Sequence, residues 1–468
     1  VNFGRREDYE ALDEMGILLE GKVVIARYGG NFRGYKVKFA EERGAAGVIM
    51  FNDAPADPID PYPDGPMLNG EIIQRGSVLT LPWTGDPLTP FVPALPVDGD
   101  RQVDRLDPED VPLHTIPVLP VGYNAASEIL SRMTGDAAPE DWQGGLDLTY
   151  RITGGSDMTV RVRVNQPKAL TRAVNVVGTL EGTEFPDEWF ILGSHYDPWG
   201  FGAVDPNGGT SMLLVLAEAL GELAEQGCGP RRSIMIAHWD AEEYGIIGST
   251  EWVEEFLPEL TSGAIAYINA DSAVSGPNFN TSSSPSLKQP ILDAIQDVSY
   301  AGEDRSIYEW WAERTDDGLP TMGNLGGGSD HVAFYTHAGI PSASLGSGGR
   351  SGIYHSNYDN FAWYERFGDA EWVFGPMIAR ADGLLALRFA NADLLPYDVT
   401  RYAVDTRTHV QTLMDVATQR GVDVNLSRLL DATSDLDVAA AALNDARAQR
   451  LAAGSLSAGE AKRINSAF

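Results

Sequence analysis

Histidine and carboxylate side chains follow several apolar runs of this sequence, and their types suit metal chemistry. They stand directly after the runs or in the glycine-rich stretches nearby: His195, Asp197, Asp205, Glu242, Glu243, Asp271 and His355. Imidazole nitrogen and carboxylate oxygen are both zinc ligands, and one carboxylate can bridge two ions about 3.5–4 Å apart. The set therefore predicts a hydrolytic centre that holds paired metal ions.

Two carboxylates of this set suit other tasks than metal binding. Glu242 stands beside Glu243 and could take a proton from the attacking water. Asp197 closely follows His195 and could fix the tautomer of that ring. Each residue alone has an ordinary structural explanation, since acids favour helix N-termini and Asp-Pro is a turn signal. Their common position after successive strands is what favours the metal centre.

Apolar and β-branched runs alternate with helical stretches in the middle of the chain. Strands are expected over 173–180, 189–195, 233–239 and 264–270, and helices over 208–225 and 245–256. This alternation predicts an α/β fold in which a partly parallel sheet is covered by helices on both faces. Ligands collect at the carboxyl ends of strands in such sheets, which is where the histidines and carboxylates stand.

The flanking parts differ from this central part. The N-terminal part is rich in Pro, Gly and Asp, with strands expected over 21–27 and 47–51 and a helix over 37–46. The last part is helical to its end and includes an amphipathic stretch around 438–443. Three domains are predicted, over residues 1–168, 169–388 and 389–468.

The charge balance excludes one class of partner. The 468 residues carry a formal net charge of −33, which repels nucleic acid and disfavours an anionic membrane surface. Cys228 is the single cysteine, so no internal disulfide is possible. No apolar run reaches the roughly 18 residues that a membrane-spanning helix needs. The sequence opens at Val1 without an initiator methionine, and we expect a fragment or a processed chain.

Several stretches closely resemble the M28 zinc peptidases. The specific resemblance is to the glutamate carboxypeptidase branch, which includes prostate-specific membrane antigen and the catalytically inactive transferrin receptor. The stretches that carry it are 191–209, 239–252, 266–272 and 354–356 in the central part, 1–5 and 25–29 before it, and 394–404 after it. The resemblance covers essentially the whole chain. It implies the mixed sheet of a zinc exopeptidase sandwiched by helices, a protease-associated apical domain and part of a C-terminal helical dimerisation domain.

The resemblance also implies a role for each candidate residue of the centre. His195 and Asp271 would hold one zinc ion, Glu243 and His355 the other, and Asp205 would bridge the two. Glu242 would be the general base, Asp197 would orient His195, and Tyr354 would donate a hydrogen bond to the oxyanion. The peptide bond between Asp205 and Pro206 is cis in this family.

Further residues are implied for substrate and for a second kind of metal. Arg33 would bind the terminal carboxylate of a peptide, and Gly328 and Ser329 belong to a loop that resembles the family's substrate-lining loop. A structural calcium ion would join the apical and peptidase domains, because oxygen ligands suit this cation. Its ligands would be Thr89, the Val92 backbone, Glu251 and Glu254.

The sequence departs from the family at residues that set specificity. An arginine pair that receives acidic residues is replaced by Ser344 and Gly346 in the expected loop 342–346, and an apical asparagine is replaced by Ser77. The family's first protease segment and the lysine–tyrosine pair that grips the terminal side chain lie outside this sequence. We therefore expect a carboxypeptidase that is permissive at the penultimate position.

The expected function is that of a co-catalytic dizinc exopeptidase, most like a glutamate carboxypeptidase acting on small peptides. An M28 aminopeptidase is one alternative, and a non-catalytic binding protein like the transferrin receptor is the other. The complete ligand set favours an enzyme, because the receptor branch has lost most of it. The family further suggests a homodimer formed through the C-terminal helices and an exported protein, whether periplasmic, extracellular or membrane-anchored.

Overall fold

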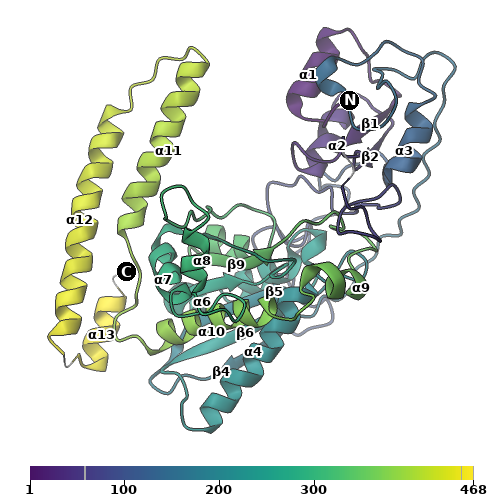
Figure 1. Ribbon diagram of the computed structural model, residues 1–468. Coiled ribbons are helices and arrows are strands. Elements are labelled where there is room, and N and C mark those ends of the chain that lie inside the picture. Colours follow the sequence, from purple (N-terminus) through teal and green to yellow (C-terminus); the bar gives the residue numbers. More distant parts are fainter. Residues whose placement is uncertain (57–58, 455, 467–468) are drawn as a thin grey trace.

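A computed structural model describes residues 1–56, 59–454 and 456–466 of the chain (Figure 1). Its N-terminal part contains a three-stranded parallel sheet in the order β1-β2-β3, and its central strand Gly47–Phe51 is buried along its whole length. The elements of this part are α1 Arg6–Glu14, β1 Val23–Arg27, α2 Arg33–Glu41, β2 Gly47–Phe51, β3 Val118–Val121, α3 Tyr123–Leu130 and η1 Glu140–Trp142.

The middle of the chain forms a six-stranded mixed sheet in the order β4-β6-β5-β7-β9-β8. Its inner strands run parallel, whereas the edge strands β4 and β8 pair antiparallel. His195 at the end of β5 lies opposite Trp239 at the end of β6, so the carboxyl ends of these strands meet at one edge. The strands are β4 Val176–Leu180, β5 Phe185–His195, β6 Arg232–Trp239, β7 Ala264–Asn269, β8 Asn278–Ser283 and β9 Ser342–Gly348.

Helices cover both faces of this sheet, because successive side chains of a strand point to opposite faces. Phe190 and Leu192 of β5 belong to a core with α4, α7 and α10, while Ile191 packs on the other face with residues of α5, α6 and η3. The helices are α4 Asn207–Glu225, η2 Glu242–Tyr244, α5 Ile247–Glu255, α6 Leu257–Gly263, α7 Pro285–Ile295, α8 Ile307–Ala312, η3 Ala333–His337, α9 Phe361–Trp363, η4 Tyr364–Gly368 and α10 Phe374–Asn391.

The last helices are α11 Thr400–Gln419, α12 Ser427–Ala452 and α13 Ala458–Asn465. Figure 1 shows α11 and α12, in yellow-green and yellow, as a long hairpin that stands away from the sheet. One buried ion pair ties the hairpin to the sheet domain, since Lys288 Nζ of α7 lies 2.8 Å from Asp405 Oδ2 of α11. Among the described residues, no helix has the length and apolar character needed to cross a membrane.

The predicted fold class is confirmed, with some element bounds corrected. The helix expected over 37–46 begins at Arg33 and ends at Glu41, because the chain turns at Gly44, whose φ is +77°. The segment 342–346, expected as a loop, lies in strand β9. Ser342 and Ala343 are fully buried there, and strands of such small residues resemble loops in composition. Strands β3 and β8 were not predicted.

Candidate active site

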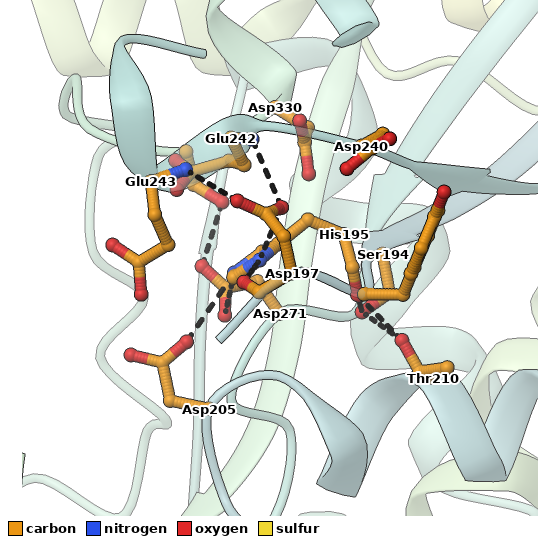
Figure 2. A network of polar contacts seen from close by, with 12 residues as sticks. Ser194, His195, Asp197, Asp205, Thr210, Asp240, Glu242, Glu243, Asp271 and Asp330 are labelled. Atoms are coloured by element: carbon orange, nitrogen blue, oxygen red, sulfur yellow. Dashed lines mark hydrogen bonds and ion pairs between the residues drawn. The ribbon is translucent and has the colours of Figure 1, made fainter. Parts of the chain in front are cut away.

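Five side chains with metal-ligand chemistry meet at the carboxyl edge of the six-stranded sheet. Figure 2 labels His195, Asp205, Glu243 and Asp271 among them. They come from five segments: His195 ends β5, Asp205 precedes α4, Glu243 lies in η2 after β6, Asp271 follows β7, and His355 lies in the loop after β9. The Asp205–Pro206 bond is cis, as the resemblance implies.

The glycine-rich start of α4 permits this approach of distant segments. A Cβ on Gly209 would overlap the carbonyl oxygen of Ala270, which directly precedes Asp271. Only glycine lets the helix backbone come so close to the end of β7. The sequence Gly208-Gly209 therefore allows Asp205 and Asp271 to face the same histidine.

The first group of candidate ligands surrounds His195. Its Nε2 lies 3.1 Å from Asp271 Oδ1 and 3.3 Å from Asp205 Oδ1. Figure 2 shows these carboxylates beside the His195 ring. The ring is 1% exposed, so the three groups meet in a nearly dry environment where unpaired carboxylate charges are costly.

The second group surrounds His355 and shares Asp205 with the first. His355 Nε2 lies 3.2 Å from Glu243 Oε1 and 3.3 Å from Asp205 Oδ2. Asp205 thus turns one oxygen toward each histidine. Asp205 Oδ1 and Glu243 Oε1 are buried and accept no hydrogen bond from the described residues. Buried oxygens without donors, in two groups that share one carboxylate, fit a pair of metal ions.

Both histidines are positioned to carry their ring proton on Nδ1, which leaves Nε2 free to bind a metal ion. His195 Nδ1 lies 3.0 Å from the carbonyl oxygen of Asp197, and His355 Nδ1 lies 3.1 Å from that of Arg75. A carbonyl oxygen only accepts hydrogen bonds, so each Nδ1 carries the proton and donates it. When the ring is neutral, as in a metal-bound histidine, its lone pair is on the Nε2 that faces the carboxylates.

Asp197 lies beside the His195 ring with both its main chain and its carboxylate. Its main-chain oxygen is the closer partner of His195, and its Oδ1 lies 3.5 Å from the ring. The carboxylate also accepts the backbone N–H groups of Glu242 at 3.0 Å and Glu243 at 3.2 Å. Asp197 therefore accepts hydrogen bonds from His195 Nδ1 and from the backbone at the start of η2. It fixes the tautomer of His195 and the backbone positions of Glu242 and Glu243.

Glu242 is the carboxylate of this cluster whose surroundings most suit a base. Its side chain is 7% exposed. Burial raises the pKa of Glu242 well above its usual range, and the negative charges of Asp330, Asp271 and Glu243 add to this, while His195 opposes it. A carboxylate with a raised pKa is a stronger proton acceptor once ionised, which is what general-base catalysis requires.

A chain of hydrogen bonds that the sequence did not indicate leads from the core to Asp271. Trp239 Nε1 donates to Tyr267 OH at 3.0 Å, and Tyr267 OH donates to Asn269 Oδ1 at 3.1 Å. Asn269 Nδ2 donates to Ser329 Oγ at 2.9 Å, and Ser329 Oγ donates to Asp271 Oδ2 at 2.7 Å. The alternation of Tyr267 and Asn269 on one face of β7 is the one sequence signal that could have revealed it.

Two parts of the chain match known families. Residues 175–370 match peptidase family M28, and residues 2–81 match the PA domain. Residues 175–370 form an M28 peptidase domain. All five candidate ligands lie within it, as do Asp197 and Glu242. The predicted family is confirmed.

Nearly the whole chain is similar to parts of longer proteins. It is 37% identical over 468 residues to a probable glutamate carboxypeptidase of Arthroderma benhamiae and 39% identical over 450 residues to the probable glutamate carboxypeptidase LAMP1 of Arabidopsis thaliana. It is 35% identical over 479 residues to Aminopeptidase NAALADL1 of Mus musculus. These matches cover 95%, 94% and 95% of this chain and 63% of each relative.

A cavity of about 410 Å³ opens between the PA domain and the candidate ligands of the peptidase domain. The PA side supplies a mostly apolar wall that includes Phe32, Leu79 and Trp83, together with the cation Arg33. Arg33 stands at the start of α2, and its Nε donates to the Ser77 carbonyl at 2.7 Å. The cavity is therefore lined by both the cation Arg33 and the candidate metal ligands.

The other residues expected to contact substrate lie in different positions: some line the cavity and one is buried behind it. Tyr354 and Gly328 line the cavity. Ser329 is 7% exposed, and its hydroxyl is engaged by Asp271 and Asn269. Outside this set, the nearby His331 is buried, with its Nε2 2.8 Å from the Gly326 carbonyl oxygen. The Gly/Ser-rich loop thus presents backbone to the cavity and serine to the metal-ligand side.

The residues expected around a calcium ion lie where the loop that follows the PA match meets α5. Glu251 accepts the backbone N–H of Asp86 at 2.5 Å and also that of Ala94. Thr89 Oγ1 and Glu254 Oε2 are buried without a hydrogen-bond partner among the described residues. Burial raises the pKa of Glu251 to about 8 and that of Glu254 to about 7. The Val92 backbone N–H donates to the Thr89 carbonyl at 3.2 Å.

Proposed function

We propose that this chain is the catalytic part of a co-catalytic dizinc exopeptidase that acts as a carboxypeptidase on small peptides. The observation that carries the proposal is Asp205, whose two oxygens turn toward two histidines with matching tautomers. His195 and Asp271 would hold one zinc ion, Glu243 and His355 the other, and Asp205 both. When bound, zinc supplies a Lewis acid for the scissile carbonyl and lowers the pKa of water.

The chain's own residues supply the proton transfer. Glu242 accepts the proton of the attacking water at its carboxylate and later gives it to the leaving amine. Asp197 holds the backbone of Glu242 at 3.0 Å, so the base starts from a fixed position. Carboxylate oxygens of the cluster are buried away from bulk water. The proton is therefore transferred within the site and is not lost to solvent.

Tyr354 is suited to donate a hydrogen bond to the oxyanion. Its ring stacks on that of His355 with centroids 3.7 Å apart. This stacking places the Tyr354 side chain next to the candidate metal ligands. Tyr354 is half exposed at the cavity, where partial loss of water around its hydroxyl raises its pKa above its usual range, and the charge of Asp205 adds to this. The hydroxyl therefore keeps its proton at neutral pH and can stabilise developing negative charge.

Arg33 favours a carboxypeptidase, because its guanidinium is suited to bidentate capture of a terminal carboxylate. The positions of the family's arginine pair, Ser344 and Gly346, lie on strand β9 and carry no charge. A hydrogen bond to a charged group contributes about 1.5–3 kcal/mol. Without two such contacts, we propose that the penultimate residue of the substrate is chosen loosely.

An aminopeptidase is the second candidate, favoured by the mouse and rat relatives named Aminopeptidase NAALADL1. A panel of blocked dipeptides with free carboxylates, and a matched panel of free-amine amidated peptides, separates the two on the full-length protein. We expect cleavage of the blocked set with less than tenfold preference for Asp or Glu at the penultimate position. Cleavage of the amidated set alone would establish the aminopeptidase instead.

The metal content tests the enzyme proposal independently of any substrate. We expect native mass spectrometry of the zinc-loaded full-length protein to show close to two zinc ions per chain. A chain that binds no zinc after loading would favour the non-catalytic alternative. Arg33 and the cavity would then serve ligand binding without hydrolysis.

Calcium binding by Thr89, the Val92 backbone, Glu251 and Glu254 is part of the same proposal. The buried oxygens of Thr89 and Glu254 that lack donors support it. Calcium there would link the PA domain to α5 of the peptidase domain. Isothermal titration with calcium, before and after Glu254→Gln, tests it, and equal heats from both proteins would contradict it.

We also propose a homodimer through the C-terminal hairpin and an exported location, as in the resembling family. Leu413 of α11 and Leu436 and Val438 of α12 are 53%, 44% and 74% exposed, and such side chains suit an interface. Light scattering after size-exclusion chromatography should give twice the chain mass for the full-length protein. A monomer mass at micromolar concentration would contradict the dimer.

A further inference from the structure

One short stretch of PA-domain backbone, residues 75–77, contacts both the metal cluster and the carboxylate anchor. Arg75 N–H donates to the His355 carbonyl at 3.0 Å, and His355 Nδ1–H donates to the Arg75 carbonyl at 3.1 Å. Ser77, two residues later, accepts the Arg33 Nε–H at 2.7 Å. The segment therefore touches a candidate metal ligand at one end and the substrate's anchor at the other.

Gly76 joins these two contacts through its own geometry. Its φ is +148°, a conformation that residues with a side chain rarely adopt. A Cβ at this position would overlap Arg33 Nε and Cζ, so the guanidinium packs directly on the Gly76 backbone. The position of Arg33 thus depends on the same peptide units that hold His355.

His355 needs this support, because its own backbone is strained. Its φ is +56°, in the left-handed region that non-glycine residues seldom occupy. Such a residue keeps its conformation only when its neighbours fix it. The paired hydrogen bonds with Arg75 fix both the main chain of His355 and the proton on its ring. The Arg75 side chain is directed elsewhere, with Nη1 donating to the Ile73 carbonyl at 3.0 Å.

We propose that residues 75–77 of the PA domain are a positioning element that couples the carboxylate anchor Arg33 to the His355 half of the metal site. The proposal rests on the proposed function for the identity of metal and substrate. It assigns the PA domain a part in metal binding, through backbone atoms alone. A peptide carboxylate that holds Arg33 would steady the segment that sets the His355 tautomer, so substrate and metal would favour each other.

Gly76→Ala tests the coupling in the full-length protein, with Gly21→Ala as the matched control. Gly21 also lies in the PA domain and also has a positive φ, +67°, but among the described residues no heavy atom beyond its chain neighbours lies within 4 Å of its Cβ position. We expect Gly76→Ala to raise KM at least tenfold for a blocked dipeptide with a free carboxylate. We also expect it to lose one zinc ion at a chelator concentration where the wild type keeps both.

The remaining variants distinguish coupling between the anchor and the metal site from separate effects on substrate binding and on zinc binding. Arg33→Ala should raise KM but retain both zinc ions, since it removes the anchor and leaves the segment in place. A Gly76→Ala protein that keeps both zinc ions as tightly as the wild type would overturn the proposal. So would a Gly21→Ala protein with the same losses, because the effect would then be general strain.

Hydrogen–deuterium exchange of the wild type decides the matter even if Gly76→Ala fails to fold. The amide of Arg75 donates to His355, so fixing His355 with zinc should slow exchange in a peptide covering residues 73–79. Equal exchange with and without zinc would overturn the proposal. Failure of the proposed function would appear separately, as a zinc-loaded wild type that cleaves no peptide.

Discussion

Removing the hydroxyl of Ser329 is the sharpest test of how the candidate metal ligands are held in place. Ser329 Oγ donates to Asp271 Oδ2 at 2.7 Å and accepts from Asn269 Nδ2 at 2.9 Å. Ser329 donates the last hydrogen bond of the series that begins at Trp239 and ends at Asp271. Ser329→Ala deletes both bonds and leaves the buried Asn269 amide without its acceptor.

The size of the effect follows from the kinds of bond that are lost. The bond to the Asp271 carboxylate is charge-assisted and contributes about 1.5–3 kcal/mol, and the bond from Asn269 is neutral and contributes about 0.5–1.5 kcal/mol. Part of this appears as lost stability of the fold. Groups that orient a metal ligand typically contribute about 10–100-fold in metal affinity. We expect Ser329→Ala to weaken zinc binding at the His195 half of the site by that factor.

Competition with a chromophoric chelator measures this affinity without any substrate. Ser347→Ala is the matched control, because Ser347 is also buried and loses a hydrogen bond of 2.6 Å, but to the Gly276 carbonyl and not to a candidate ligand. Zinc affinity within twofold of the wild type would refute the reasoning for Ser329. A raised KM with unchanged zinc affinity would instead return Ser329 to the substrate-binding role expected from the sequence.

Three further outcomes are expected. Glu242→Gln should keep both zinc ions and lower kcat about 10²–10⁴-fold, as loss of a general base does, so near-normal turnover in a steady-state assay would contradict the assignment. Asp205→Asn should lower zinc occupancy more than any other single ligand change, as elemental analysis would show, because Asp205 faces both histidines. Burial raises the pKa of Glu254 to about 7, so the folded state binds its proton more tightly than the unfolded chain does. In cation-free buffer, stability should therefore fall as pH rises from about 4.5 to 7, and urea unfolding should show a weaker fall for Glu254→Gln.

His195, Glu243 and Asp271 could be predicted because each follows an apolar strand with a clear signal. His195 and Asp271 come directly after apolar runs that form parallel strands β5 and β7. The carboxyl ends of such strands meet at one edge, so side chains far apart in sequence come together there. Glu242 and Glu243 follow β6 in the same way.

The supporting residues could not be predicted, because their roles depend on contacts that leave no trace in composition. Arg75 acts through its backbone, and any residue offers the same N–H and C=O groups. Asn269 and Ser329 are polar residues that become buried only in the assembled sheet and loop. Strand β9 is built from small residues such as Ser342 and Ser344, whose composition resembles a loop.

The wide spacing of the candidate ligands has a thermodynamic consequence. Residues 195, 205, 243, 271 and 355 meet only when the sheet is formed, so an unfolded chain offers zinc no comparable site. Zinc would then bind the folded state selectively and add RT ln(1 + [Zn²⁺]/Kd) to its stability, about 2.7 kcal/mol at a hundredfold excess over Kd. The midpoint of thermal unfolding would rise with free zinc. A melting curve would thus rank metal-site variants by affinity before any substrate is known.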